Sequence, residues 1–243
     1  MKVGFSTDTG NVRLINQDSL FVSNFHDSFP LFIVADGMGG HNAGEVASKL
    51  AVKKVEEIFK EKYTTFRKIE DVEETIKNSV MEANNYICEQ SRLDSNLFGM
   101  GTTLTLGFLF KNIFIIGHVG DSRAYIIHNS SIKQLTEDHS LVRKLVSEGR
   151  ITETEAENHP QKNIITRAVG TDNNIEVDII EIQVSNGDII FICSDGLTNM
   201  VKKDKLFEIF TNTEDIQIAC DECVRLAKAN GGYDNITVIG IRF

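Results

Sequence analysis

The sequence predicts an α+β sandwich, in which helices cover the outer faces of two packed and largely antiparallel sheets. Short apolar runs bounded by turn residues recur along the chain, as buried strands require. Several connections between these runs are too short for a helical crossover, so neighbouring strands should run antiparallel. Two longer segments repeat their apolar residues at the helical period, and helices combined with antiparallel sheets favour layers of helix over sheet.

The predicted strands share an unbroken run of apolar residues between turn-forming residues. In chain order they are 31–35, 113–117, 124–127, 189–193 and 236–241. Short connections that contain Asn, Ser, Gly or Asp are predicted to be hairpin turns. These connections are 111–112, 120–122, 129–131 and 185–188.

Two long segments, 42–62 and 70–92, are predicted to be amphipathic helices, and Asn42 is the candidate N-cap of the first. Segment 138–160 is predicted to be a helical insert between strands. It holds a short apolar helix and then the capping box Thr152-x-x-Glu155.

The composition is typical of a folded protein, and the net negative charge disfavours binding to polyanions. The 243 residues include 25 Lys+Arg and 35 Asp+Glu, a net charge of −10, which disfavours a nucleic-acid or anionic-membrane binder. Hydrophobic residues make up 41%, yet no apolar run approaches the ~18 residues of a membrane span. Asp8 interrupts the N-terminal segment before a signal-peptide apolar region forms, so we expect a cytoplasmic protein without membrane insertion. Because repeats and Pro/Gly/Ser linkers are absent, residues 1–243 are predicted to be one domain.

The cysteines Cys88, Cys193, Cys220 and Cys223 are too few and too irregular for a disulfide framework. Cys220 and Cys223 form a Cys-x-x-Cys, for which half a zinc site or a redox pair is the alternative interpretation. Both lie on the apolar face of a helical pattern in 213–229, and no second Cys or His pair stands at metal-ligand spacing. We therefore predict that they fill the core.

The aspartates Asp36, Asp121, Asp195 and Asp234 stand where an apolar run stops or begins. Strand ends hold side chains more precisely than free loops do, so these carboxylates can converge at one rim. Close carboxylates raise one another's pKa, whereas a divalent cation keeps them ionised, and oxygen ligands suit Mg²⁺ or Mn²⁺ better than zinc. Turn chemistry is the alternative, because Asp and Gly are common turn residues. The glycines in 37–44, which let backbone approach a ligand closely, favour the site.

Other phosphate-binding and hydrolase motifs are missing from the sequence. It contains neither Gly-x4-Gly-Lys-Ser/Thr nor Gly-x-Ser-x-Gly, and no cysteine is followed six residues later by Arg. A protein nucleophile is therefore not supported. The remaining candidate is water activated by metal.

Seven motifs follow one another along nearly the whole chain. They are Thr7-Asp8-x-Gly10-x-x-Arg13-x-x-Asn16-Gln17-Asp18, Val34-Ala35-Asp36-Gly37-Met38-Gly39-Gly40-His41, Gly101-Thr102-Thr103-Leu104, Gly120-Asp121-Ser122-Arg123, Leu135-Thr136-x-Asp138-His139-Ser140, Ser194-Asp195-Gly196-Leu197 and Asp234-Asn235-Ile236-Thr237. In this order they resemble the metal-dependent protein serine/threonine phosphatases of the PP2C type. The compact bacterial branch, whose members partner membrane-bound Hanks-type kinases, is the most similar.

The resemblance implies a four-layer α-β-β-α sandwich with a metal cluster at one end. Asp36 would bridge two Mn²⁺ or Mg²⁺ ions, with the carbonyl of Gly37 on the first ion and Asp195 and Asp234 on the second. Asp121, together with Asp195, would hold the third, weaker metal typical of the bacterial branch. The implied substrates are phosphorylated proteins, and we expect a monomer.

The resemblance also implies roles in handling the phosphate. Asp18 would act through metal-bound water, and Arg13 would bind the phosphate, which suits its planar pair of donors. The eukaryotic branch carries His directly after Asp-Gly, where this chain has Met38. His41, the nearest imidazole, is a candidate to protonate the leaving oxygen or orient the phosphate, with a plain loop histidine as the alternative.

The insert at about 139–165 resembles the flap beside the family's active site and should influence substrate choice. We expect His139 to cap the helix of this insert rather than to ligate metal. Two other functions remain as alternatives. One is a phosphodiesterase or nuclease that uses the same metals, which the negative charge disfavours. The other is a non-catalytic module that binds phosphoproteins, which the complete acidic set disfavours.

Overall fold

Two antiparallel sheets lie face to face in the computed structural model, which describes residues 1–23, 29–40, 43–157 and 159–243. The first sheet has the strand order β1 (Lys2–Asp8), β11 (Ile236–Arg242), β10 (Ile189–Cys193), β7 (Arg123–His128) and β8 (Ser131–Gln134). The second has the order β2 (Asp18–Val22), β3 (Leu31–Met38), β5 (Leu104–Phe110), β6 (Ile113–Val119) and β9 (Asp178–Gln183). A short strand, β4 (Gly101–Thr102), also pairs with β3.

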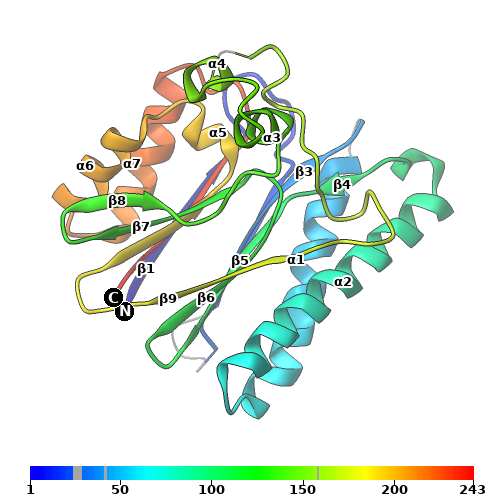
Figure 1. Cartoon of the computed structure of the whole chain (residues 1–243), viewed down its shortest axis with the longest axis horizontal. Helices are drawn as coiled ribbons and strands as arrows, with labels where there is room; N and C mark the ends of the chain where they lie inside the picture. The colour runs from blue at the N-terminus through cyan, green and yellow to red at the C-terminus, as the bar shows by residue number, and fades with distance from the viewer. Residues whose placement is uncertain (24–28, 41–42, 158) are drawn as a thin grey trace.

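Helices cover the outer face of each sheet, so the layers run helix, sheet, sheet, helix (Figure 1). On the second sheet lie α1 (Ala43–Lys62) and α2 (Ile69–Leu93), and on the first lie α6 (Lys203–Asn212) and α7 (Ile216–Ala229). At one end of the sandwich lie α3 (Leu141–Ser147), α4 (Glu153–Glu157) and α5 (Asp195–Thr198). Two 3-10 turns, η1 (Tyr63–Thr65) and η2 (Ser95–Leu97), follow α1 and α2. The predicted four-layer α+β fold is confirmed.

Alternation along the strands separates the core into three layers of buried side chains. In β3, Leu31, Ile33 and Ala35 pack under α1 and α2, whereas Phe32 and Val34 face the first sheet. The space between the sheets is therefore filled by the inner residues of both. The same period aims Asp36 at this space, at the point where the apolar filling ends.

Each predicted strand is found, although most extend beyond the predicted run, and β1, β2, β4, β5, β8 and β9 were not predicted. Two predicted hairpins are confirmed, because β5 pairs with β6 and β7 with β8. The other two predictions are wrong. Connections 120–122 and 185–188 each leave a strand of one sheet and enter a strand of the other. A tight turn that crosses between sheets has the same residue types as a hairpin turn, so its sequence does not distinguish the two.

The predicted helices are found as α1 and α2, while Asn42, the proposed N-cap, lies outside the described residues. The capping box is confirmed, since Glu155 accepts from the backbone of Thr152 at 2.7 Å and the Thr152 hydroxyl accepts from the backbone of Glu155 at 3.3 Å. Cys220 and Cys223 are buried free thiols of the core, as predicted. Among the described residues, none of the helices is both long and apolar enough for a bilayer crossing.

Candidate active site

Asp18 and Asp36 lie side by side at the open end of the space between the sheets. They are paired across β2 and β3, whose antiparallel register places Asp18 opposite Asp36. The backbone of Asp36 is fixed by the next motif along the chain: its N–H donates to Thr103 Oγ1 at 2.9 Å, and its carbonyl accepts from Thr102 Oγ1 at 2.9 Å. The Gly-Thr-Thr motif therefore holds Asp36 in place.

Asp195 comes from the opposite sheet, at the end of β10 and the first residue of α5. Ser194, the residue before it, donates its hydroxyl to Asp18 Oδ2 at 2.7 Å and so links the two sheets directly. Asn199 Nδ2, one helical turn later, donates to Asp195 Oδ2 at 3.0 Å. These contacts aim Asp195 towards the Asp18–Asp36 pair.

Asp121 lies in the tight connection from β6 to β7, which crosses between the sheets and reaches the same end of the molecule. Ser122, its neighbour, shares a hydrogen bond of 2.8 Å with Thr103, whose hydroxyl also accepts from the Asp36 backbone. Asp121 is buried. This connection crosses between the sheets instead of forming the predicted hairpin, and the crossing brings Asp121 close to the other aspartates.

Asp234 and Arg13 form an ion pair at the mouth of the site, with Arg13 Nη2 2.9 Å from Asp234 Oδ2. The two side chains are 51% and 39% exposed, so solvent screens the pair and its net contribution to stability is ~0–1 kcal/mol. Asn235 organises the loop that carries Arg13: its Nδ2 donates to the carbonyls of Thr9 and Ile15 at 2.9 and 3.0 Å. Arg13 is therefore held near the acidic cluster but remains free to exchange partners.

The pKa shifts of Asp18, which is buried, and of Asp36, which is half-buried, agree with their convergence on the other acids. Burial raises the pKa of Asp18 to about 7, with Asp195 and Asp234 adding to the rise, and hydrogen bonds from Thr237 and Ser194 oppose it. Burial and the charges of Asp18 and Asp195 raise the pKa of Asp36 well above its usual range.

Asp121, which is buried, and Asp195, which is half-buried, behave in the same way. Burial and the nearby charge of Asp195 raise the pKa of Asp121 to about 7. Burial and the Asp234 charge raise the pKa of Asp195, which Arg123 partly offsets. Carboxylates from both sheets therefore repel one another across one small volume, and a bound cation would relieve this repulsion.

The donor chemistry fits an oxygen-preferring divalent cation. Asp18 Oδ1 is buried and has no hydrogen-bond partner among the described residues, although Oδ2 of the same carboxyl accepts from Ser194. An unpartnered carboxylate oxygen in an acidic cluster suits a cation or its water. Within residues 1–23, 29–40, 43–157 and 159–243, no three acidic, imidazole or thiol side chains stand at the spacing of a finished ion cage. The acids are nonetheless close enough to shift one another's pKa. Their fit to a divalent cation therefore rests on the charge and the oxygen atoms of their carboxylates.

Comparison with known proteins identifies the family. A family model described as Protein phosphatase 2C matches residues 11–227. The chain belongs to the protein phosphatase 2C family. The phosphatase is 41% identical over 239 residues to the protein named serine/threonine phosphatase stp of Listeria monocytogenes, covering 98% of this chain and 94% of that one.

Solved structures agree with this assignment. The phosphatase superimposes on serine/threonine phosphatase Stp1 of Staphylococcus aureus with a TM-score of 0.93 and 34% identity, over 99% of this chain and 94% of the other. A second structure is the catalytic domain of the serine/threonine protein phosphatase PstP in complex with two manganese ions. It matches with a TM-score of 0.85 and 32% identity over 98% of this chain and 96% of that one.

The structure brings together most of the residues predicted for the phosphatase site. Arg13, Asp18, Asp36, Asp121, Asp195 and Asp234 gather at one end of the sandwich. Gly37 lies beside Asp36 within β3. His41 falls outside the described residues, so its predicted role stays a prediction.

The prediction for His139 is wrong in one respect. Ser140 is the N-cap of α3, with its Oγ accepting from the backbone N–H of Arg143 at 3.3 Å. His139 instead accepts from the backbone N–H of Gly120 through Nδ1, at 3.0 Å. Sequence reasoning also missed the supporting roles of Ser194 and Asn235. The motifs that contain them were the available signal, because polar residues beside strand-end acids commonly orient those acids.

Proposed function

We propose that this phosphatase hydrolyses phosphoserine and phosphothreonine esters of proteins, using two Mn²⁺ or Mg²⁺ ions and a third, more weakly held ion. The observation that carries the proposal is the convergence of buried and half-buried carboxylates from both sheets, which raise one another's pKa. The names of the relatives and the manganese complex of a solved neighbour support the substrate class and the metal.

Each proposed metal ligand is an oxygen. Asp36 and the carbonyl of Gly37 would hold the first ion, Asp36 with Asp195 and Asp234 the second, and Asp121 with Asp195 the third. When bound, such ions activate a water for attack on phosphorus and neutralise charge on the phosphoryl oxygens.

Arg13 is proposed to bind the substrate phosphate. Its guanidinium keeps its charge at any working pH and presents two parallel donors, which match a phosphoryl group. The ion pair with Asp234 is exposed on both sides and therefore weak, so a dianionic phosphate can compete for Arg13 at little cost. Asp18 is proposed to orient the attacking water through the unpartnered Oδ1, while Ser194 fixes the other oxygen.

The test is hydrolysis of p-nitrophenyl phosphate and of a phosphothreonine peptide with and without Mn²⁺. We expect activity that depends on the metal and falls at least ~100-fold in Asp36→Asn and Asp195→Asn, because each variant removes a charged ligand oxygen. Activity without metal, or wild-type activity in both variants, would reject the proposal. Cleavage of a phosphodiester faster than of the phosphopeptide would favour the nuclease alternative, and tight phosphopeptide binding without turnover would favour the binding module.

We further propose that the phosphatase acts in the cytoplasm and opposes a membrane-bound serine/threonine kinase. The free thiols at all four cysteines suit a reducing compartment. Phosphoproteomics after deletion of the phosphatase tests this pairing. Sites that gain phosphate in the deletion strain should lose it when the kinase is deleted as well, and sites that persist without the kinase would contradict the pairing.

A further inference from the structure

Four exposed apolar side chains lie beside the ion pair at the mouth of the site. They are Val12, Leu14, Ile15 and Tyr233, which we call the mouth patch. Val12 and Leu14 flank Arg13 in the chain, and Tyr233 directly precedes the other partner of the ion pair. Leu14 is 97% exposed and Tyr233 is 63% exposed. Exposed apolar surface is unfavourable in water, so several such side chains at one place indicate a surface that a partner covers.

The two loops that carry the mouth patch are held against each other through their backbones. The N–H of Asn11 donates to the Gly232 carbonyl at 2.7 Å, and Asn11 Nδ2 donates to the Gly231 carbonyl at 3.0 Å. A Cβ at Gly10 would lie 2.2 Å from the carbonyl oxygen of Asp234, so the loops also touch at this position. The backbone under the patch is therefore fixed, and a ligand that binds there pays little entropy to order it.

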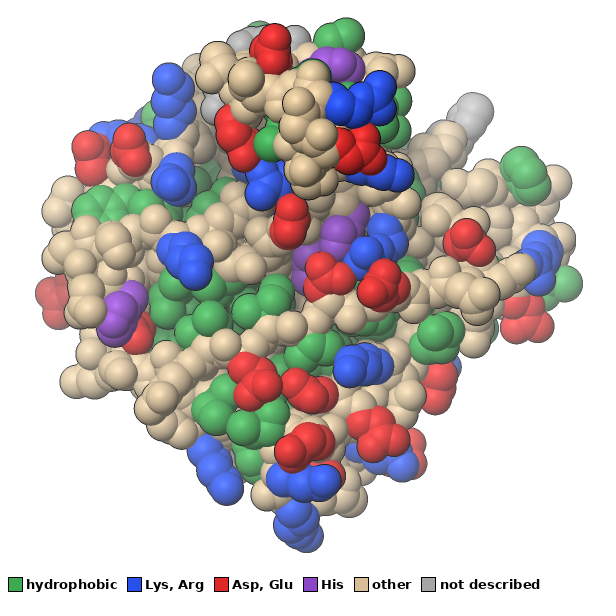
Figure 2. All heavy atoms as spheres, viewed as in Figure 1, with side chains coloured by type: hydrophobic (Ala, Val, Ile, Leu, Met, Phe, Trp, Pro, Cys, Tyr) green, Lys and Arg blue, Asp and Glu red, His purple; other side chains and the backbone are tan. Residues whose placement is uncertain are grey.

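The mouth patch differs from the other apolar surface of the phosphatase. The three core clusters formed by the described residues include none of its four members. Figure 2 shows apolar side chains between β8 and β9, on the face that it draws. Of the isoleucines in those two strands, Ile132, Ile180 and Ile182 pack against the core, so that surface is the edge of the core. The mouth patch is instead carried by loops that leave its side chains open to a partner.

The mouth patch is also separate from the largest cavity near the acidic cluster. This cavity of about 880 Å³ lies between α3 and the start of α6, and Asp195 is part of its lining. The described residues that line it include Lys162, Lys202 and Lys203 and no member of the mouth patch. The cavity borders the 139–165 insert, whereas the patch borders the loop of the proposed phosphate-binding arginine. The two are different surfaces beside one site.

We propose that the mouth patch binds apolar side chains of the substrate protein next to the phosphorylated residue. The inference rests on the proposed protein phosphatase activity and adds a substrate class to it. Consecutive Cα atoms are about 3.8 Å apart, so Leu14 lies one residue from the arginine proposed to hold the phosphate, and Tyr233 lies one residue from Asp234. A substrate chain whose phosphate binds Arg13 therefore places its neighbouring residues against both side chains. This continuity with the phosphate site makes the substrate the occupant of the patch.

The experiment compares two phosphothreonine peptides that carry either Leu or Ser at the two positions on each side of the phosphothreonine. The wild-type phosphatase is expected to show kcat/KM about tenfold higher for the Leu peptide, mainly through KM. L14S/Y233S should reduce this ratio to about twofold or less. High NaCl should leave the wild-type ratio unchanged, because salt screens charges and not apolar contacts. Each ratio is measured within one protein, so a shifted Arg13 or a lower folded fraction affects both peptides alike and cancels.

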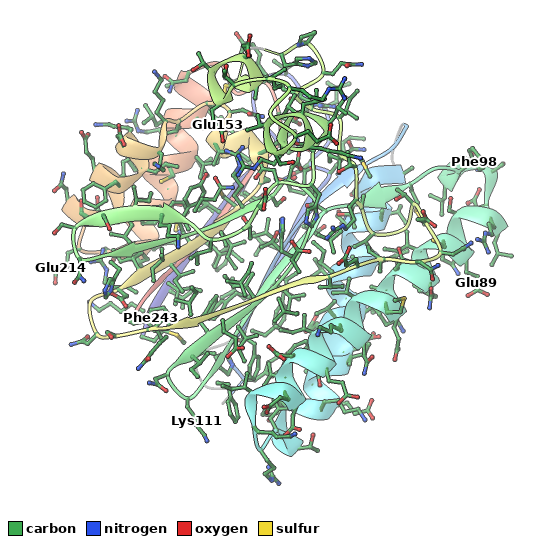
Figure 3. All side chains as sticks on the ribbon, viewed as in Figure 1. Glu89, Phe98, Lys111, Glu153, Glu214 and Phe243 are labelled. Atoms are coloured by element: carbon green, nitrogen blue, oxygen red, sulfur yellow. The ribbon has the colours of Figure 1, made fainter. Side chains whose placement is uncertain are left out.

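Two further variants separate the apolar contact from other effects of substitution. L14M/Y233F keeps both side chains apolar and should keep the wild-type ratio. The matched control L93S/F98S removes an aliphatic and an aromatic side chain that are 74% and 82% exposed. They lie at the end of α2 and in the turn after it, where Phe98 is labelled in Figure 3. This control should also keep the wild-type ratio.

Three results would overturn the inference: a wild-type ratio near one, the same loss in L93S/F98S, or the loss of the ratio in L14M/Y233F. A wild-type dimer in sedimentation that L14S/Y233S dissociates would overturn it as well, because the patch would then join two copies of the chain. Failure to hydrolyse p-nitrophenyl phosphate and both peptides would instead reject the phosphatase proposal, and this inference with it.

Discussion

Gly37 and Gly196 follow the two central aspartates because no side chain fits at either position. A Cβ at Gly37 would lie 2.0 Å from the carbonyl oxygen of Gly44, and a Cβ at Gly196 would lie 1.9 Å from that of Asn235. Neither Asp-Gly pair forms a turn, since Asp36 and Gly37 lie within β3 and Asp195 and Gly196 begin α5. The turn interpretation of these pairs is therefore wrong, and close backbone approach is the physical reason for the glycines.

Replacement of Gly196 tests this explanation. Gly196→Ala is expected to lower the free energy of unfolding by roughly 2 kcal/mol or more, because backbone must move to relieve the contact with Asn235. Thermal or urea unfolding measures the change. Gly40→Ala is the matched control, since a Cβ at Gly40 meets nothing within 4 Å, and its stability should change little. Equal effects of the two substitutions would contradict the steric explanation.

The raised pKa of Asp18 predicts a specific pH dependence of stability. Between the usual carboxyl pKa near 3.8 and the folded-state pKa of about 7, the folded protein binds more protons than the unfolded chain. In metal-free buffer this carboxyl therefore costs stability that grows as pH rises through that window. Asp18→Asn should stabilise the protein at pH 8 by on the order of a few kcal/mol, and by much less at pH 4.5.

The measurement for Asp18→Asn is the difference in unfolding free energy from wild type across this pH range, with EDTA present. The difference is informative because burial also lowers the pKa of His118 to about 4, which favours folding as pH rises. The His118 contribution is the same in Asp18→Asn and in the wild type, so it cancels in the difference between their unfolding free energies. A pH-independent difference would show that the Asp18 carboxyl is not perturbed by burial.

At the scale of elements, His139 joins the segment containing α3 and α4 to the acidic cluster. Its backbone N–H donates to the Gly120 carbonyl at 2.7 Å, and its Nδ1 accepts from the Gly120 N–H at 3.0 Å. Nδ1 is therefore unprotonated, so Nε2 carries the proton and donates to Asp178 Oδ2 at 3.1 Å. Its carbonyl accepts from the backbone of Thr166, which closes the other end of the segment.

Loss of this imidazole should loosen the base of the segment. His139→Ala is expected to cost about 1–3 kcal/mol of stability, because the buried N–H of Gly120 loses its side-chain acceptor. Hydrogen exchange should also speed up at Gly120 and across 139–166 relative to the sheets. His159→Ala, which removes an exposed loop contact, serves as the comparison and should leave both quantities nearly unchanged. Unchanged exchange at Gly120 in His139→Ala would contradict the proposed link.

At the scale of the whole molecule, the acidic cluster is built from both sheets. Asp18 and Asp36 belong to the second sheet, whereas Asp195 and Asp234 flank strands of the first. An ion bound between them would join the two halves of the sandwich, and the unfolded chain offers no comparable site.

Divalent metal should therefore raise the unfolding temperature of the phosphatase. At a Mn²⁺ concentration about 100 times Kd, the expected stabilisation is about 2.7 kcal/mol, reversed by EDTA. Differential scanning calorimetry of the wild type and of Asp36→Asn measures it, and the variant should lose most of the shift. An equal shift in both proteins would place the metal elsewhere.

Local sequence patterns account for much of the fold and for which residues form the site. Apolar runs located the central strands, helical spacing located α1 and α2, and the ordered motifs singled out Asp36, Asp195 and Arg13. Strands such as β1 and β9 were missed because polar residues interrupt them, and their pairing with apolar neighbours makes them strands.

Residue type and short-range spacing alone determined which side chains carry charge, which segments favour helix or strand, and which family's motifs are present. Tertiary structure alone decided that connections 120–122 and 185–188 cross between sheets. It also decided that Lys162, Lys202 and Lys203 line the same cavity. The physical reason is distance along the chain: propensity depends on neighbours a few residues away. The partner of a strand and the walls of a cavity depend on packing between residues that the chain keeps far apart.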